Sequence, residues 1–290
     1  MSGVGSEQGS DQRPVAGSEQ GSDRGSEQGI VDAIRLAYDG SADAWATGPT
    51  AVYRRLAEAL VAAAPSSLAG RRVLDLGAGT GVASEVLLEA GARPIAVDLA
   101  LGMLQHHRTE RPPGTVGDAQ ALPFGDGTFD AVVAAFCLNH LPDPTAGLAE
   151  CRRITRSGGV VLASTFPTDA NHPAKTIVEA ELERFGYQRP AWYRTFKARI
   201  AELTGDADAF ASAATDAGFS DIEVVRVDVE AGLDRPELAV EWRLNMPHSI
   251  GFFTGLDRDT RTALRARAVE ALSGDLPSAV PALFLRAGVA

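Results

Sequence analysis

Hydrophobic residues divide the middle of the chain into short apolar runs that alternate with longer amphipathic stretches. The runs "RVLDLG", "RPIAVDL", "DAVVAAFCL" and "GVVLASTF" are almost continuously apolar. The stretches between them, such as "GVASEVLLEAG" and "TAGLAECRRIT", repeat their apolar positions at helical spacing. A strand that is apolar on both faces is typical of a parallel sheet covered by helices on each side. The pattern therefore predicts a doubly wound α/β fold.

Helical patterns also flank this alternating region. Residues 30–39 and 50–64 predict two helices before the first strand, separated by Gly40 and by the "TGP" break at residues 47–49. After Phe166 the alternation is interrupted twice by helical, aromatic-rich inserts, while "DIEVVRVDVE" and "ALFLRAGV" predict two further strands. We expect one domain with helical insertions that form a lid over the substrate. We expect the domain to span residues 30–290. Its core spans about 65–166, and the inserts span about 167–203 and 234–272.

The first 29 residues have a different composition. They contain "GSEQG" three times and almost no large apolar side chains, which predicts a disordered low-complexity tail.

Overall charge narrows the function. The formal net charge of -11 argues against a nucleic-acid partner, because such binding needs clustered Lys and Arg. Cys137 and Cys151 offer neither a disulfide framework nor metal-ligand spacing, so we expect no metal site. No signal peptide and no apolar run of membrane-spanning length is visible, which favours a cytoplasmic protein without a membrane partner. The sequence carries no signal for the oligomeric state.

A glycine-rich turn follows the first predicted strand, in "VLDLGAGTGVA". In an open parallel sheet, ligands bind beyond the carboxyl ends of the strands, where the strand order reverses. A dinucleotide fold needs G-x-G-x-x-G, but here the third glycine is Gly81, one residue early, and the dinucleotide position holds Val82. The glycines alone therefore do not decide which ligand binds.

Acidic residues at the strand ends help to decide it. Asp75, Asp98 and Asp118 end or follow the first three predicted strands, so we expect their carboxylates to converge on one cleft. They would repel a pyrophosphate, whereas they would attract a nucleoside that carries positive charge and no phosphate. Asp98 in particular would be buried and uncompensated unless a donor such as a ribose diol bound it.

The motifs "VLDLGAGTG", "AVDLALGML", "GDAQALPFGDGTFDAVV" and "LAECRRITRSGGVVL" together resemble the class I S-adenosylmethionine-dependent methyltransferases, in the type 11-like branch that acts on small molecules. The resemblance covers roughly residues 38–166. It implies a Rossmann-like, seven-stranded sheet, S-adenosyl-L-methionine as cofactor and a small-molecule substrate, plausible in natural product metabolism.

The resemblance also implies roles for individual residues. It places Gly77 and Gly79 against the amino-acid part of the cofactor, Asp98 at the ribose and Asp118 at the adenine amine, with Met103 and Ala119 beside the adenine. The full set of cofactor-binding residues that it implies is Tyr38, Asp75, Gly77, Gly79, Asp98, Leu99, Met103, Asp118, Ala119 and Phe136.

Catalytic and substrate-binding candidates lie after the fourth predicted strand and in the inserts. Methyl transfer needs a base only when the nucleophile must lose a proton. His140, in "FCLNHL", is the first candidate base and His248 the second, although a histidine that only satisfies backbone groups is an equal interpretation of His140. The candidates for substrate contact are Asn139, Trp192, Tyr193 and Trp242, and His172 could also face the substrate.

Other functions compatible with the sequence remain as alternatives. A cyclase that binds S-adenosylmethionine without transferring its methyl group would use the same fold. An RNA or protein methyltransferase is disfavoured by the acidic charge and by the absence of an "N-P-P-[FY]" motif. A nicotinamide-dependent dehydrogenase is the weakest alternative.

Overall fold

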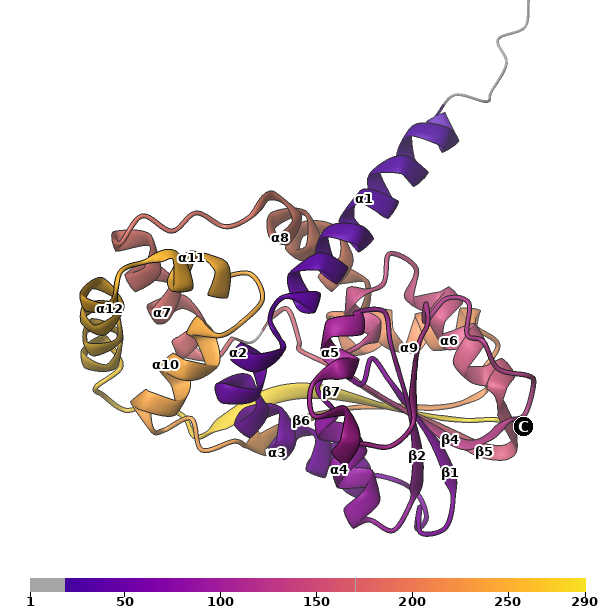
Figure 1. Ribbon diagram of the computed structural model, residues 1–290. Coiled ribbons are helices and arrows are strands. Elements are labelled where there is room, and N and C mark those ends of the chain that lie inside the picture. Colours follow the sequence, from indigo (N-terminus) through magenta and orange to yellow (C-terminus); the bar gives the residue numbers. More distant parts are fainter. Residues whose placement is uncertain (1–18, 170) are drawn as a thin grey trace, which may run out of the picture.

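The computed structural model describes residues 19–169 and 171–290, with side chains from residue 29 onward (Figure 1). Residues 1–18 of the tail predicted for residues 1–29 therefore lie outside the described residues. Residues 19–29 differ from that prediction, because helix α1 spans Glu19–Asp39. Once the apolar stretch after Gly29 is helical, each residue added at its N-terminal end extends the helix without the cost of a new nucleus.

A seven-stranded sheet forms the centre of the domain, in the order β3-β2-β1-β4-β5-β7-β6. Its strands are β1 (Arg72–Leu76), β2 (Arg93–Asp98), β3 (Gly114–Val116), β4 (Phe129–Ala135), β5 (Thr155–Thr165), β6 (Asp221–Glu230) and β7 (Ala279–Gly288). The strands from β3 to β5 pair in parallel, whereas β7 is antiparallel to both of its neighbours. The order reverses between β1 and β4. The prediction of a doubly wound α/β fold is thus confirmed.

Helices cover both faces of the sheet (Figure 1). Alternate residues of β1 point to opposite faces, so that Val73 belongs to one hydrophobic cluster and Leu74 to the other. The first cluster includes side chains of α3 (Pro49–Ala62) and α4 (Val82–Glu89), and the second those of α6 (Pro144–Ile154) and α9 (Ala207–Asp216). This two-sided burial is the reason why the central strands read as continuous apolar runs.

Between Glu19 and the start of β1, the structure contains three helices rather than the predicted two. Helix α1 ends at Asp39 and α3 begins at Pro49, as the breaks in the pattern indicate, but the short helix α2 (Ala42–Thr47) lies between them. Pro49 occupies the first turn of α3, where its missing N–H costs nothing.

Both inserts are helical and lie beside the sheet (Figure 1). The first contains α7 (Pro173–Arg184), α8 (Ala191–Thr195), a π-helical turn (Phe196–Ile200) and a 3-10 turn (Ala201–Thr204). The second contains α10 (Pro236–Leu244), α11 (Ile250–Gly255) and α12 (Arg258–Ala271). Helix α7 packs against α10 and α12, and α8 packs against α1. The remaining helical elements are α5 (Leu101–Gln105) and two 3-10 turns, Arg108–Glu110 and Leu138–His140.

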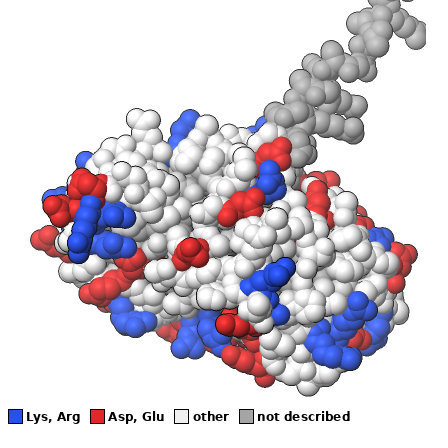
Figure 2. Space-filling model, viewed as in Figure 1, with Lys and Arg blue, Asp and Glu red and all other residues white. Residues whose placement is uncertain are grey.

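Charged residues of both signs are interspersed on the face shown in Figure 2, with no continuous basic stripe there. Among the described residues, no helix combines the length and the apolar character needed to cross a membrane.

Gly48 provides a test of how the N-terminal helices dock onto the second insert. A Cβ at Gly48 would overlap the carbonyl oxygen of Glu241 in α10 and lie 2.9 Å from Nδ2 of Asn245. We therefore expect Gly48→Ala to lower the free energy of unfolding by about 1–3 kcal/mol, the usual cost of overpacking. Urea denaturation measures this difference.

Gly251→Ala is the matched control, because a Cβ there meets nothing within 4 Å. It should change the free energy of unfolding by less than about 1 kcal/mol. Equal stability of the two variants would contradict the packing of α3 against α10.

Candidate functional site

The glycine turn lies at the carboxyl end of β1, next to the point where the strand order reverses. Gly77 and Gly79 have φ angles of 70° and 53°, in the left-handed region that favours glycine. A Cβ at Gly77 would lie 2.6 Å from Cβ of Cys137. The N–H groups of Gly77 and Ala78 donate to the carbonyl oxygen of Val97, over 2.8 and 3.0 Å. These two N–H groups are therefore occupied and do not form a phosphate cradle.

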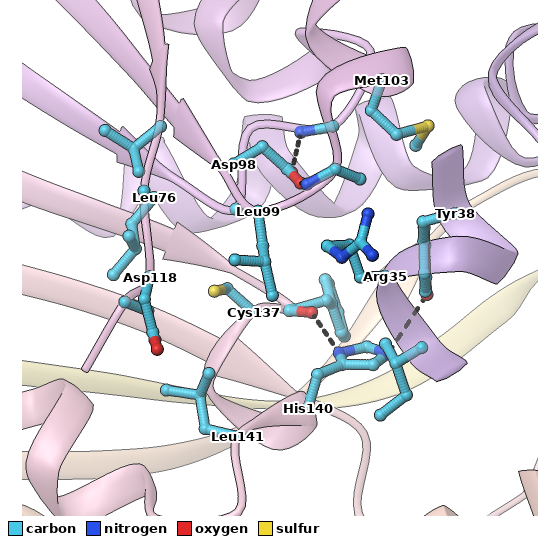
Figure 3. A pocket seen from close by; sticks show the side chains of 18 of the residues that line it. Arg35, Tyr38, Leu76, Asp98, Leu99, Met103, Asp118, Cys137, His140 and Leu141 are labelled. Atoms are coloured by element: carbon cyan, nitrogen blue, oxygen red, sulfur yellow. Dashed lines mark hydrogen bonds between the residues drawn. The ribbon is translucent and has the colours of Figure 1, made fainter. Parts of the chain in front are cut away.

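Asp98 at the end of β2 fixes the position of this turn. Its carboxylate accepts hydrogen bonds from the N–H groups of Gly79, over 2.7 Å, and Ala100, over 2.8 Å (Figure 3). Burial raises the pKa of Asp98, and these two hydrogen bonds counteract the shift. The expectation that the carboxylate would be uncompensated without a bound donor such as a diol was wrong, because two backbone N–H groups already compensate it. Each oxygen still has a lone pair for a further donor.

A cavity opens beside Asp98, between the turn, the ends of β2 and β4, and helix α1. Most of the predicted cofactor-binding residues line it: Tyr38, Gly77, Gly79, Asp98, Leu99, Met103, Asp118, Ala119 and Phe136. We call it the cofactor cavity. Asp118 accepts a hydrogen bond from the N–H of Gln120 through Oδ1 and also lines the cavity. The cavity thus combines two carboxylates with an apolar wall.

Asp75 is the exception among the predicted cofactor-binding residues. It is only 1% exposed, accepts a 2.5 Å hydrogen bond from Ser84 Oγ and does not line the cofactor cavity. Burial raises its pKa to about 6. The side chain points away from the cavity because alternate residues of β1 face opposite sides of the sheet. Asp75 therefore connects the strand to α4 rather than contacting a ligand directly.

A second cavity, which we call the acceptor cavity, lies between the sheet and the two inserts. Four aromatic residues line both cavities, namely Tyr38, Tyr53, Phe136 and His140; we call them the aromatic partition. Phe136 has a φ of 55°, an uncommon conformation for a residue other than glycine. Such strain is maintained only where the surroundings impose it, as they often do at functional sites.

His140 and Tyr38 form a hydrogen-bonded pair within the partition (Figure 3). The carbonyl oxygen of Phe136 can only accept, so Nδ1 of His140 donates to it over 3.1 Å. Nε2 is then the acceptor, and the Tyr38 hydroxyl donates to it, also over 3.1 Å. Burial lowers the pKa of His140 to about 4 and raises that of Tyr38. His140 is therefore neutral, with its lone pair already engaged.

The acceptor cavity contains most of the predicted substrate contacts. Asn139, Trp192 and Tyr193 line it, and so does His248, the second candidate base. The rings of Tyr193 and His248 stack with their centroids 3.9 Å apart. Asn139 is 8% exposed, and among the described residues its Oδ1 has no hydrogen-bond partner. An acceptor molecule that donates a hydrogen bond would satisfy that oxygen.

Two predicted substrate contacts are corrected by the structure. Trp242 has no exposed surface and packs in the core, so it does not line the acceptor cavity. His172 caps the start of α7, accepting from the N–H of Ala174, while its Nε2 bonds to the carbonyl oxygen of Pro277. Trp242 lies on the face of α10 that points into the protein, and His172 directly precedes α7 as its N-cap residue.

His248, the second candidate base, is also engaged. The Arg243 guanidinium can only donate, so its 3.2 Å contact with Nε2 makes that nitrogen the acceptor. Burial, followed by the charge of Arg243, lowers the pKa of His248 well below its ordinary value. Because the lone pair of His248 accepts from a guanidinium, which cannot relay a proton from an acceptor, His248 is not placed to act as a base.

Sequence reasoning missed several residues that line the cavities. Tyr53 belongs to the aromatic partition, Arg35 lines the cofactor cavity, and Lys175 and Arg243 line the acceptor cavity. Tyr53 gave no signal beyond helical spacing. Lys175 did give a signal in the sequence, because the chain contains only two lysines. Both of them line the acceptor cavity.

The cofactor cavity fits S-adenosylmethionine, which carries a sulfonium and no phosphate. The carboxylates of Asp98 and Asp118 would repel a phosphate, and Arg35, the one cation among the residues that line the cavity, is paired with Asp39 at 3.1 Å. Met103 and Ala119 offer apolar surface for an adenine, and Gly79 lines the cavity without a side chain. The fold and this cavity define a nucleoside-binding α/β enzyme.

Comparisons with known proteins identify the family. A family model described as "Methyltransferase domain" matches residues 74–163. The chain is 35% identical over 202 residues to demethylmenaquinone methyltransferase of Renibacterium salmoninarum, which covers 67% of this chain and 83% of the relative. A relative of the same name from Mycobacterium sp. (strain KMS) is 38% identical over 153 residues, which cover 53% of this chain and 65% of the relative.

Solved structures agree with these matches at the level of the fold. Phosphoethanolamine N-methyltransferase 2 of Haemonchus contortus, in complex with S-adenosyl-L-methionine, aligns with a TM-score of 0.54 and 19% identity, covering 81% of this chain and 52% of that chain. The [4+2]-cyclase SpnF aligns with a TM-score of 0.50 and 20% identity, covering 81% of each chain. This chain belongs to the class I S-adenosylmethionine-dependent methyltransferases. It is an enzyme that uses S-adenosylmethionine.

We expect Asp98→Ala to weaken the binding of S-adenosylmethionine about tenfold to hundredfold, since a hydrogen bond to a charged group contributes about 1.5–3 kcal/mol. Isothermal titration calorimetry measures the affinity. Asp130→Asn is the matched control, because Asp130 also accepts a backbone hydrogen bond, from Arg72, but at the opposite edge of the sheet. Equal affinity in the two variants would exclude Asp98 from the cofactor site.

Proposed function

We propose that this enzyme transfers the methyl group of S-adenosylmethionine to a small molecule bound in the acceptor cavity. One observation carries the proposal: the aromatic partition lines both cavities, so that a donor in one and an acceptor in the other would meet there. Alignment of two reactants in a site that excludes water contributes much of the rate of such a displacement.

The aromatic walls of the acceptor cavity favour a ring-shaped acceptor. Phe166, Trp192, Tyr193 and Phe196 line this cavity in addition to the partition. The name of the bacterial relatives, demethylmenaquinone methyltransferase, also points to a ring as the acceptor. We propose a small aromatic metabolite, of the kind modified in natural product metabolism. A cytoplasmic location, where thiols stay reduced, would suit the free thiols of Cys137 and Cys151.

When bound, S-adenosylmethionine would supply an electrophilic methyl group, with its sulfur as the leaving group that keeps both bonding electrons. An acceptor hydroxyl that attacks this methyl group must lose its proton. We propose that the proton passes to the oxygen of Tyr38 as the Tyr38 proton passes to Nε2 of His140. His140 thus acts as a base through Tyr38, because its own lone pair faces the Tyr38 hydroxyl.

Incubation with methyl-labelled S-adenosylmethionine and a panel of hydroxylated aromatic acceptors tests the proposed function. Label should appear in an acceptor, with release of S-adenosylhomocysteine. Tyr193→Ala should raise KM for that acceptor about tenfold, because a stacked aromatic wall is lost, and leave cofactor affinity unchanged. Phe252→Ala is the matched control, since Phe252 lines neither cavity.

Two results would contradict the proposed function. Conversion of an acceptor without labelling would favour a cyclase, and the absence of both conversion and labelling across the panel would exclude a small aromatic acceptor.

Tyr38→Phe tests the proposed route of the proton. We expect kcat to fall about a hundredfold, the lower range of general acid–base catalysis, because phenylalanine has no hydroxyl to relay the proton. KM for the acceptor should change little. Steady-state kinetics with the labelled cofactor provides both constants, and an unchanged kcat would rule out the relay.

A further inference from the structure

The charge of the acceptor cavity is opposite to that of the whole protein. The chain has a formal net charge of -11, yet four of the five charged residues that line this cavity are cations: Lys175, Arg189, Lys197 and Arg243, against Glu179. Glu179 is already bound by Arg189, whose Nε and Nη2 both donate to it. The cavity therefore carries excess positive charge that no carboxylate in its wall neutralises.

Arg243 is the most deeply buried of these cations, at 7% exposed. Its guanidinium contacts the neutral His248 ring and lies over the Trp242 ring, with Cζ 5.2 Å from the ring centroid. Within the described residues, no carboxylate oxygen lies within 4.0 Å of the guanidinium. Burying a permanent charge in this way is costly unless a partner compensates it.

Lys175 is a partly buried cation of the same cavity that also has no carboxylate partner among the described residues. Its Nζ lies over the rings of Phe166 and Trp242, 4.1 and 5.8 Å from their centroids. Burial, followed by the charge of Arg243, lowers the pKa of Lys175 to about 7. Arg243 Cζ and Lys175 Nζ lie 5.2 and 5.8 Å from the centroid of the same Trp242 ring, and both residues line the acceptor cavity. The two cations therefore repel each other, and an anion bound to both would relieve that repulsion.

We propose that the acceptor is an aromatic carboxylate whose anionic group binds to Arg243 and Lys175. This proposal rests on the proposed function and names the substrate class for the same cavity. The ring would pack against the aromatic walls, where Tyr193 and Phe196 already stack, with their centroids 5.9 Å apart. A hydroxyl on the acceptor could donate to Oδ1 of Asn139, which lacks a partner within the described part of the chain.

Protonation of Lys175 gives the proposal a second readout. The other titratable and charged groups around it are Arg243, Lys197, His172 and Glu179; of these, only Glu179 is acidic, and Arg189 occupies it. A bound carboxylate should raise the pKa of Lys175, so that the protein takes up a proton on binding at pH values above about 7. Because the chain contains only two lysines, NMR of lysine-labelled protein, assigned with Lys197→Arg, can follow this titration.

The experiment compares a charged probe with its uncharged analogue. We would titrate 3-hydroxy-2-naphthoate and 3-hydroxy-2-naphthamide into the protein saturated with S-adenosylhomocysteine. The carboxylate should bind about tenfold to hundredfold more tightly than the amide. Lys175→Met should remove most of this preference, and Lys175→Arg should restore it. The affinity for S-adenosylhomocysteine should stay unchanged in both variants, which shows that they are folded.

Lys197→Met is the matched control, since Lys197 lines the same cavity but is exposed. We expect it to change the preference by less than about threefold. Equal affinity for the two probes, binding of neither, an unchanged preference in Lys175→Met, or a larger loss in Lys197→Met than in Lys175→Met would overturn the proposal.

The outcomes also separate this proposal from the proposed function. An acceptor that receives label but carries no anionic group, and is unaffected by Lys175→Met, would overturn the carboxylate proposal and leave methyl transfer intact. The opposite result is a carboxylate that binds through Lys175 in a protein that transfers label neither to it nor to any other acceptor. That result would overturn methyl transfer and leave the carboxylate site intact.

Discussion

The hydrogen bonds from the N–H groups of Gly79 and Ala100 to the Asp98 carboxylate connect the glycine turn after β1 with the end of β2. Since β1 and β2 pair in parallel, these segments meet at the same edge of the sheet. These hydrogen bonds compensate a buried charge and hold the turn in a left-handed backbone conformation, which Gly77 and Gly79 can adopt without steric cost. The shape of the cofactor cavity depends on this arrangement, because the turn and Asp98 form one of its walls.

The site therefore consists of two parts with different origins. The sheet and its turns supply the cofactor cavity, with carboxylates that suit a cationic nucleoside. The inserts supply most of the acceptor cavity, with cations and aromatic rings. The two parts meet at the aromatic partition, where the strained backbone of Phe136 and the hydrogen bond between Tyr38 and His140 set the positions of the rings. A functional site on a common fold is expected to draw its specificity from inserted segments in this way.

Sequence patterns predicted the part of the site that depends on strand ends. Two-sided apolar strands reveal a parallel sheet, and acids after such strands must lie at its carboxyl edge, which is why Asp98 and Asp118 were found. Asp75 was misplaced because alternate residues of β1 face opposite sides of the sheet, and the sequence pattern did not show on which side the cavity opens. The same limit applies to helices: spacing alone did not show that Trp242 faces the core while Lys175, on another helix, faces the cavity. The scarcity of lysine is visible in the sequence, but only the fold shows that both lysines line the same cavity.

We infer that donor and acceptor occupy two cavities that meet at the aromatic partition. A crystal structure of the protein with S-adenosylhomocysteine tests it most directly. We predict ribose hydroxyls within about 3 Å of the Asp98 carboxylate, the adenine beside Met103 and Ala119, and the sulfur facing Tyr38 and His140. A ligand whose ribose lies away from Asp98, or whose sulfur points away from the acceptor cavity, would contradict the account.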